Sequence, residues 1–248
     1  FPRAFDATAD GKVNVTIKER QPGSSFKPIN LAIAFEQRKA TPATMLLDVP
    51  TCFQTTGSRG YCPRNYDSSF RGPVQQRFAL GNSYNIPAVK IAAMNGIESI
   101  IGYASAMGIS TFRSPDQYGI SIGLGAAEVK MIDMAVAFGV LANQGVKMPL
   151  LSILEVQDYQ GVTLERHDPQ ERISALSQLT QDEELEQSGD AQRILHRAPA
   201  YLTSHILLDN NARSGAFGSN SQLVIPDQVV SVKTGTTNNL RDNWTIGY

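Results

Sequence analysis

The chain has little of several residue types that mark particular functions. Its 248 residues include two cysteines, one tryptophan and three histidines, and the net charge is -1. A balanced charge without a basic stripe interleaved with aromatic residues argues against nucleic-acid binding. His167, His196 and His205 stand far apart and show no metal-ligand spacing. We therefore expect neither a metal site nor a bound cofactor.

Long apolar runs are also missing from the sequence. The best run, Met131–Ala142, is interrupted by Asp133 and is shorter than the roughly 20 residues that a membrane-spanning helix needs. The sequence begins at Phe1 with no signal-peptide pattern, so we expect a piece whose anchor or targeting segment has been cut away. The composition, with 42% hydrophobic and 18% charged residues, is ordinary for a globular protein. We expect one domain over residues 1–248.

The two cysteines lie in a stretch rich in glycine, proline, serine, threonine and asparagine. Cys52 and Cys62 are ten residues apart there. They are either a loop disulfide formed in an oxidising compartment or a pair of unrelated thiols. The disulfide is favoured, because a long loop without secondary structure gains from a covalent link.

Periodicity and turn residues predict the order of the elements. The chain should begin with a strand at Lys12–Ile17, follow it with several helices and end with two paired strands. The helices are expected at Ser25–Glu36, Pro73–Leu80, Pro87–Asn95, Ile97–Met107, Val129–Asn143 and Ala198–Asn210, with a short strand at Met45–Val49, a hairpin within Leu151–Arg166, an acidic surface run at Gln181–Glu186, and final strands at Val229–Lys233 and Asn243–Tyr248 joined by Thr237–Asp242. This order predicts an α+β fold, with an antiparallel sheet packed against helices and an all-helical lobe.

One stretch, Gln21–Lys27, places a hydroxyl and an amine at the start of a predicted helix. Ser24 follows a Pro-Gly pair, and Lys27 comes three residues later, a spacing that puts both side chains on one helix face. Free backbone N–H groups and the helix dipole favour negative charge on the Ser24 oxygen. A bare S-x-x-K pattern is short, however, and by itself more often marks a helix cap followed by a solvated lysine.

Two further polar motifs follow in the chain. Ser83-Tyr84-Asn85 lies on a loop between predicted helices, and Lys233-Thr234-Gly235-Thr236 ends a β-branched run. A Gly123-x-Gly125 pattern also invites a dinucleotide-binding interpretation, but Glu128 occupies the sixth position, which argues against it.

The three motifs, in this order, resemble those of penicillin-binding proteins and serine β-lactamases. The flanking residues are similar to one branch, the transpeptidase domain of class A, bifunctional penicillin-binding proteins; the similar stretches are Arg20–Pro28, Pro63–Asp67, Ala79–Val89 and Lys233–Thr237. Tyr84 stands where many relatives have aspartate. The resemblance runs from about Gly11 to Tyr248. It leads us to expect a transpeptidase fold truncated at both ends, with the glycosyltransferase domain and membrane anchor outside this chain.

The resemblance implies acyl transfer through a covalent intermediate on Ser24, on the outer face of the bacterial cell membrane. Lys27 would be the base, with its pKa lowered by burial and by Lys233. The Ser83 hydroxyl would pass a proton to the leaving group, and Asn85 would hold Lys27 and the substrate amide. The remaining implied substrate-binding residues, which include the carboxylate-binding threonines, are Tyr84, Thr234, Gly235 and Thr236. Backbone N–H groups of Ser24 and Thr236 would form the oxyanion hole.

The expected function is a D,D-transpeptidase that cross-links peptidoglycan stem peptides ending in D-Ala-D-Ala and is acylated by β-lactams. One alternative is a β-lactamase or D,D-carboxypeptidase, in which water is the acceptor and a placed carboxylate activates it. Another is a non-catalytic penicillin-binding sensor domain. We see no water-activating signature near the motifs, and the class A flanking pattern makes the sensor less favoured.

Overall fold

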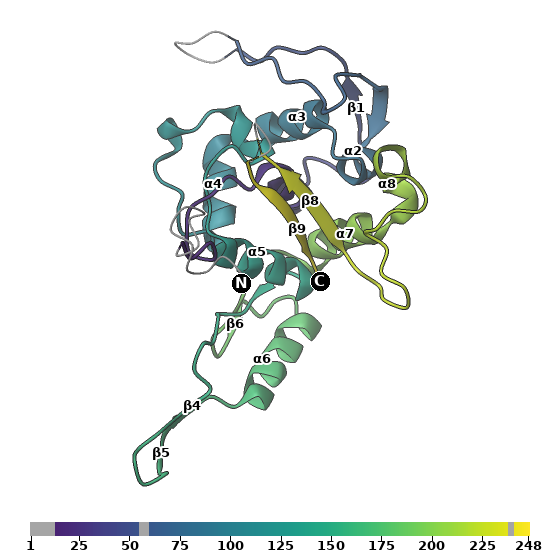
Figure 1. The fold of residues 1–248 in the computed structure, drawn as a ribbon. Coiled ribbons are helices and arrows are strands. Elements are labelled where there is room, and N and C mark those ends of the chain that lie inside the picture. Colours follow the sequence, from purple (N-terminus) through teal and green to yellow (C-terminus); the bar gives the residue numbers. More distant parts are fainter. Residues whose placement is uncertain (1–12, 55–59, 238–240) are drawn as a thin grey trace.

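The computed structural model describes residues 13–54, 60–237 and 241–248 (Figure 1). The helical elements are η2 (Gly23–Phe26), α1 (Lys27–Glu36), α2 (Gln76–Gly81), α3 (Asn85–Asn95), α4 (Ile97–Ala106), η3 (Pro115–Gln117), η4 (Ile120–Leu124), α5 (Met131–Ala142), α6 (Pro169–Gln181), α7 (Arg197–Leu208) and α8 (Asn210–Phe217). The strands are β1 (Met45–Asp48), β2 (Gly72–Gln75), β3 (Val146–Lys147), β4 (Glu155–Gln157), β5 (Thr163–Arg166), β6 (Gln187–Ser188), β7 (Ala191–Arg193), β8 (Val232–Thr236) and β9 (Asn243–Gly247).

Helix α1 lies in the core of the main lobe. It is buried along its whole length up to Phe35, and it packs against α3, α4 and α7. Pro28 is compatible with the first turn, where its missing N–H has no intrahelical acceptor. Apolar side chains point into the core on all sides of this helix, among them Ile29, Leu31, Ile33 and Phe35. A helix that is apolar all round belongs in the interior, so α1 gives the site at its N-terminus a rigid base.

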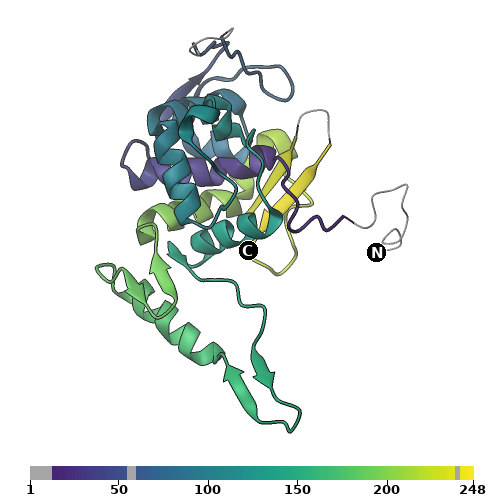
Figure 2. The same ribbon diagram turned by 90° about the vertical axis from the view of Figure 1, so that its left-hand side faces the viewer.

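The hairpin β8–β9 covers the N-terminal end of α1 (Figure 2). Its register pairs Lys233 with Ile246 and Gly235 with Trp244, and the indole Nε1 of Trp244 donates to the Gln21 carbonyl at 3.0 Å. Gly235 lets the strand approach the chain before α1, because a Cβ there would lie 2.4 Å from the Pro22 oxygen. The last strand pair is thereby fixed directly beside Ser24.

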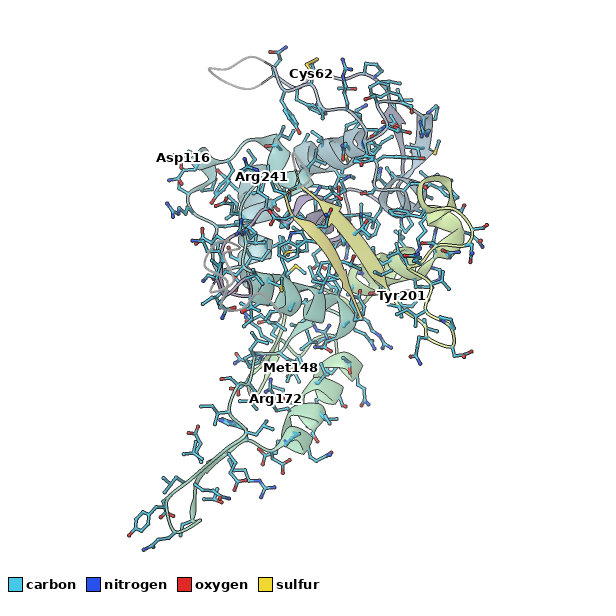
Figure 3. All side chains as sticks on the ribbon, in the orientation of Figure 1. Cys62, Asp116, Met148, Arg172, Tyr201 and Arg241 are labelled. Atoms are coloured by element: carbon cyan, nitrogen blue, oxygen red, sulfur yellow. A yellow bond between two sulfur atoms is a disulfide. The ribbon has the colours of Figure 1, made fainter. Side chains whose placement is uncertain are left out.

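A separate lobe between α5 and α7 extends away from the core (Figure 1). The three-stranded sheet β3–β7–β6 and helix α6 share a small buried cluster of Val146, Leu179 and Ala191. The hairpin β4–β5 projects beyond them, and its side chains point outward from the ribbon (Figure 3). The acidic run predicted to lie on the surface follows α6 and is exposed at Asp182, Glu183 and Glu184.

The α+β prediction is confirmed, since helices pack with antiparallel strand pairs throughout the described residues. The predicted helices are present, with most of their ends shifted by one or two residues. Only part of the expected loop Thr237–Asp242 falls on described residues, since positions 238–240 lie outside them.

Three of the predicted elements are wrong in whole or in part. The strand predicted at Val229–Lys233 begins only at Val232 and continues to Thr236, and Val229 is exposed. The described part of Lys12–Ile17 forms no strand, and Val13, Val15 and Ile17 are exposed. The first β-bridge in the described chain is an isolated antiparallel one between Arg20 and Val129. Alternating apolar residues form a strand only where a partner edge is available. The predicted helix at Pro73–Leu80 is half strand, because Gly72–Gln75 pairs with β1 before α2 begins.

Helix α8 was missed in the sequence, where asparagine, serine and glycine within Asn210–Phe217 lower helix propensity. None of the helices in the part of the chain that the structure describes is long and apolar enough to span a bilayer.

Candidate active site

The turn before α1 presents one serine and buries the next. Ser24 is half-buried, and its hydroxyl has no hydrogen-bond partner among the described residues. Ser25 is completely buried, and its hydroxyl donates to the Pro22 carbonyl at 2.8 Å. Gly23, with a φ of 54°, is required here because a Cβ would lie 2.5 Å from the Thr236 oxygen. Only Ser24 therefore offers a free hydroxyl at the surface of this turn.

The amine of Lys27 is buried and held by the loop between α2 and α3. Lys27 is 2% exposed, and its Nζ lies 2.6 Å from the Ser83 carbonyl oxygen, 3.3 Å from Ser83 Oγ and 2.7 Å from Asn85 Oδ1. The Tyr84 carbonyl is a further acceptor at 3.2 Å. The sequence suggested that helical spacing alone would hold this amine beside Ser24. The structure instead places it through contacts more than fifty residues away in the chain.

Burial sets the protonation of Lys27. Desolvation lowers the pKa of its amine well below the usual value, and the positive charge of Lys233 lowers it further. The carboxylate of Asp48 acts in the opposite direction and raises this pKa. A lowered pKa makes the neutral amine more accessible, and the neutral amine is the form that a general base requires.

Ser83 lies at the centre of the site because its hydroxyl faces both lysines. Its Oγ is 3.3 Å from Lys27 Nζ and 2.8 Å from Lys233 Nζ. The backbone of Ser83 adopts a φ of 61°, a left-handed conformation that costs a non-glycine residue about 1–3 kcal/mol. The neighbouring Asn82 fixes the loop on α8, donating to the Ala212 carbonyl at 2.8 Å and accepting from the Ala216 N–H at 2.7 Å.

Lys233 is the second buried lysine, at 3% exposure. Desolvation, with a smaller contribution from the Arg213 charge, lowers its pKa to about 7. Besides Ser83 Oγ it donates to the Thr234 carbonyl at 2.9 Å. Arg213 comes from α8 and is itself 4% exposed. The site thus collects cations, as a pocket for an anionic group requires.

The free edge of β8 presents backbone groups toward the Ser24 turn. Ser231 exchanges backbone hydrogen bonds with Tyr248, and the Thr237 N–H donates to the Asp242 carbonyl. Because such pairs alternate along an antiparallel ladder, the N–H groups of Thr234 and Thr236 point to the opposite edge. Thr234 is half-buried and Thr236 is exposed, so both are open to a ligand. The Thr236 and Ser24 N–H groups can serve together as an oxyanion hole.

Tyr84 has an aromatic ring at the position where many similar motifs have a carboxylate. The Arg71 guanidinium lies 5.4 Å from the centre of this ring. The Tyr84 carbonyl is one of the Lys27 acceptors, so the residue type at this position does not affect that contact. The aspartate common in similar motifs is therefore not needed to hold Lys27.

The structure brings the predicted site residues together from three separate parts of the chain. Ser24 and Lys27, Ser83 to Asn85, and Lys233 to Thr236 converge at the N-terminal end of α1. Sequence reasoning assigned no role to Asp48, Asn65 or Arg213, which lie behind these residues. Asn65 falls within one of the flanking stretches noted above, while Asp48 and Arg213 carry no local signal.

The predicted cysteine pair is bonded in the structure. The Cα atoms of Cys52 and Cys62 are 4.2 Å apart, and their sulfur atoms form a disulfide. Cys62 lies on the loop that extends from the top of the molecule (Figure 3). This loop continues directly to Arg64 and Asn65, which contact Asn85.

Comparison with known proteins agrees with this geometry. Residues 5–248 match the family model of the penicillin binding protein transpeptidase domain. Similar curated proteins are penicillin-binding protein 1A of Pseudomonas aeruginosa, 28% identical over 93% of this chain and 31% of its own length, and penicillin-binding protein 1B of Vibrio cholerae, 28% identical over 96% of this chain and 28% of its own. The chain thus spans about a third or less of these relatives.

Solved structures show the same fold. Penicillin-binding protein 1A from Haemophilus influenzae is similar with a TM-score of 0.75 and 26% identity, covering 96% of this chain and 37% of its own. Penicillin-binding protein A from Mycobacterium tuberculosis, solved as an imipenem acyl-enzyme complex, has a TM-score of 0.75 at 19% identity, over 100% of this chain and 56% of its own. This chain belongs to the penicillin-binding protein transpeptidase domain family.

Proposed function

We propose that this chain is the catalytic unit of a D,D-transpeptidase that cross-links peptidoglycan stem peptides and is acylated by β-lactams. The observation that carries the proposal is the Ser83 hydroxyl, which bridges Lys27 and Lys233 at 3.3 and 2.8 Å in the site that the half-buried Ser24 borders. Family membership supports acyl transfer as the reaction class. We further propose that the donor peptide ends in D-Ala-D-Ala.

In the first half-reaction, Ser24 Oγ attacks the carbonyl carbon of the penultimate D-alanine. Lys27 takes the hydroxyl proton as the C–O bond forms, and the oxyanion is held by the N–H groups of Ser24 and Thr236. The C–N bond then breaks, and the terminal D-alanine leaves as an amine that receives a proton through Ser83 from the lysines. The result is a serine ester with no net change in protons.

In the second half-reaction, an amine from a neighbouring stem peptide attacks the ester carbonyl. A new C–N bond forms and the C–O bond to Ser24 breaks, while the proton that the amine gives up to Lys27 passes on to the serine oxygen. Before the terminal D-alanine leaves in the first half-reaction, Lys233 supplies positive potential for its carboxylate, and Thr234 and Thr236 hydrogen-bond to it at the free edge of β8. The acylated site must exclude water so that aminolysis of the ester is faster than its hydrolysis.

Hydrolysis needs a carboxylate that is free to activate water. Asp48, the carboxylate in the hydrogen-bond network behind the site, is not free. Asp48 is fully buried, and both its oxygens accept hydrogen bonds, from the Asn65 amide and the Arg71 N–H. Of the acids close in sequence to the motifs, Glu36 is engaged by His196 at 2.6 Å. Neither Asp48 nor Glu36 is therefore free to activate water as the acceptor.

A pulse-chase experiment tests the proposal. The protein is labelled with penicillin, excess drug is removed and the adduct is followed by mass spectrometry. We expect acylation to outrun hydrolysis by several orders of magnitude, since a missing general base alone costs roughly 10²–10⁴ in rate. Loss of the adduct within seconds, with penicilloate accumulating, would establish a β-lactamase instead.

The natural reaction is tested with a synthetic stem peptide ending in D-Ala-D-Ala. Release of D-alanine that depends on an added amine and yields a cross-linked product supports the transpeptidase. Release without any amine requirement indicates a carboxypeptidase. A stable penicillin adduct with no peptide turnover at any amine concentration would indicate a sensor. The disulfide and the substrate support a location on the outer face of the bacterial membrane.

A further inference from the structure

A buried carboxylate lies behind the site without an ion-pair partner. Asp48, the last residue of β1, is 0% exposed and makes no salt bridge within the described residues. Its Oδ1 and Oδ2 lie 3.0 and 2.8 Å from Asn65 Nδ2, and Oδ2 also accepts from the Arg71 N–H at 3.0 Å. Burying an ionised carboxylate is costly unless its oxygens are satisfied, so a retained charge here calls for a role.

The charge of Asp48 fixes the orientation of the Asn65 side chain. A carboxylate only accepts hydrogen bonds, so the NH₂ group of Asn65 must face Asp48, and this group also donates to the Ser69 carbonyl at 2.9 Å. The Asn65 oxygen consequently faces the other way and accepts from the Asn85 N–H at 2.7 Å. That N–H belongs to the first residue of α3, where the helix itself offers no acceptor.

Asn85 is thereby held at both its backbone and its side chain. Its Nδ2 donates to the Arg64 carbonyl at 2.6 Å, which turns its Oδ1 toward Lys27 Nζ at 2.7 Å. Asn65 holds the backbone of Asn85, and its neighbour in sequence, Arg64, holds the Asn85 side chain. A continuous chain of hydrogen bonds therefore runs from Asp48 through Asn65 and Asn85 to the amine of Lys27.

We propose that Asp48 and Asn65 are positioning residues of the acylation reaction, with Asp48 as the anionic anchor that holds Asn85 on Lys27. This inference rests on the proposed role of Lys27 as the base. The charged groups that act on Lys27 are Lys233 and Asp48, with Arg213 acting in turn on Lys233. Asp48 is the anion among them, and it opposes the lowering of the Lys27 pKa by burial and by Lys233.

The test is the pH dependence of penicillin acylation in the Asp48→Asn variant, which keeps the shape and removes the charge. Asp48 raises the pKa of Lys27, so the variant should have a lower one, and the acid limb of the rate profile should move to lower pH. The plateau rate should fall by about 10- to 100-fold, because a hydrogen bond to a charged acceptor is lost from the chain.

Asp133→Asn is the matched control. Asp133 is also buried, at 8% exposure, and accepts from the Ser110 N–H and hydroxyl at 2.8 and 2.7 Å, but no hydrogen bond links it to Lys27 in the described structure. This variant should lose comparable stability and keep the wild-type rate and pH profile. If Asp48→Asn behaves like this control, Asp48 is a structural residue only and the inference is wrong.

Asn65→Ala decides the matter if Asp48→Asn does not fold. It interrupts the chain of hydrogen bonds between Asp48 and Asn85, so the plateau rate should fall by a similar factor. An unchanged rate in Asn65→Ala would refute the positioning role. Failure of the wild-type protein to be labelled at Ser24 would refute the proposed function itself, and the two failures are therefore distinguishable.

Discussion

Replacing Lys233 by methionine should stabilise the protein while abolishing acylation. Lys233 is almost completely buried and has a pKa of about 7 in the folded chain, against 10.5 for an ordinary lysine. A lowered lysine pKa means that folding disfavours the charged form. Methionine keeps the length and apolar stem of lysine but removes the charge that must be desolvated.

The size of the effect follows from the two pKa values and depends on pH. Below pH 7 both the folded and unfolded chains carry the proton, and burying the ammonium costs its full amount, about 5 kcal/mol for this displacement. Between pH 7 and 10.5 the unfolded chain binds the extra proton, so the free energy of unfolding of the wild-type protein rises with pH and the cost fades. At pH 9 about 2 kcal/mol of it remains.

Lost contacts offset part of this gain. The hydrogen bonds from Lys233 to Ser83 Oγ and to the Thr234 carbonyl disappear in the variant, at roughly 1 kcal/mol each. We therefore expect Lys233→Met to be more stable than wild type by about 3 kcal/mol at pH 6 and nearly equal to it at pH 9.

Urea unfolding at the two pH values measures the effect, with the fluorescence of Trp244, the single tryptophan, as the probe. Lys39→Met is the control, because Lys39 is exposed and donates to one carbonyl, that of Asn95 at 3.2 Å. It should show no stabilisation at either pH. Two results would refute the argument from buried charge. One is a Lys233→Met variant less stable than wild type at pH 6, and the other is a stability advantage over wild type that is larger at pH 9 than at pH 6.

Three further predictions concern the base, the strand contact and the loop. Lys27→Arg should leave no measurable acylation, because arginine stays protonated and cannot accept the proton; a near-normal rate would mean that Lys27 acts only through its charge. Gly235→Ala should destabilise the fold by about 1–3 kcal/mol and slow acylation, since the new methyl group meets backbone atoms of the turn before α1, whereas Gly139→Ala, with open space at its Cβ, should do neither in a thermal melt and a labelling assay. The exported protein should contain the Cys52–Cys62 disulfide, seen by non-reducing mass analysis, and its reduction should lower the free energy of unfolding by about 2–3 kcal/mol; two free thiols in oxidised material would contradict this.

Sequence reasoning located the short motifs because their chemistry is local. The Pro-Gly turn and the helix that begins at Lys27 each follow from a few adjacent residues, whereas the last β-branched run predicted a strand three residues too early. The motif order was informative only through resemblance to a known family. Distances alone then show that Ser83 bridges the two lysines.

The parts that could not be predicted depend on contacts between distant segments. Asp48 and Asn65 are linked across 17 residues, and Asn65 reaches Asn85 across another 20. Helix α8 has weak intrinsic propensity and is held by tertiary contacts, including the pair between Arg77 and Asp209 at 2.8 Å. Conversely, Val13, Val15 and Ile17 have strand-forming residue types but are exposed and unpaired in any strand of the described chain. Local pattern is a weak guide wherever a partner segment decides the outcome.

The most direct test of the central claim is the site of penicillin attachment. The protein is incubated with penicillin, digested and mapped by mass spectrometry. Ser24 is half-buried with a free hydroxyl, whereas Ser25 is fully buried and bonded to the Pro22 carbonyl. We predict a single adduct on Ser24, absent in Ser24→Ala and retained in Ser25→Ala. An adduct on Ser25, or none at all on the folded wild-type protein, would contradict the account.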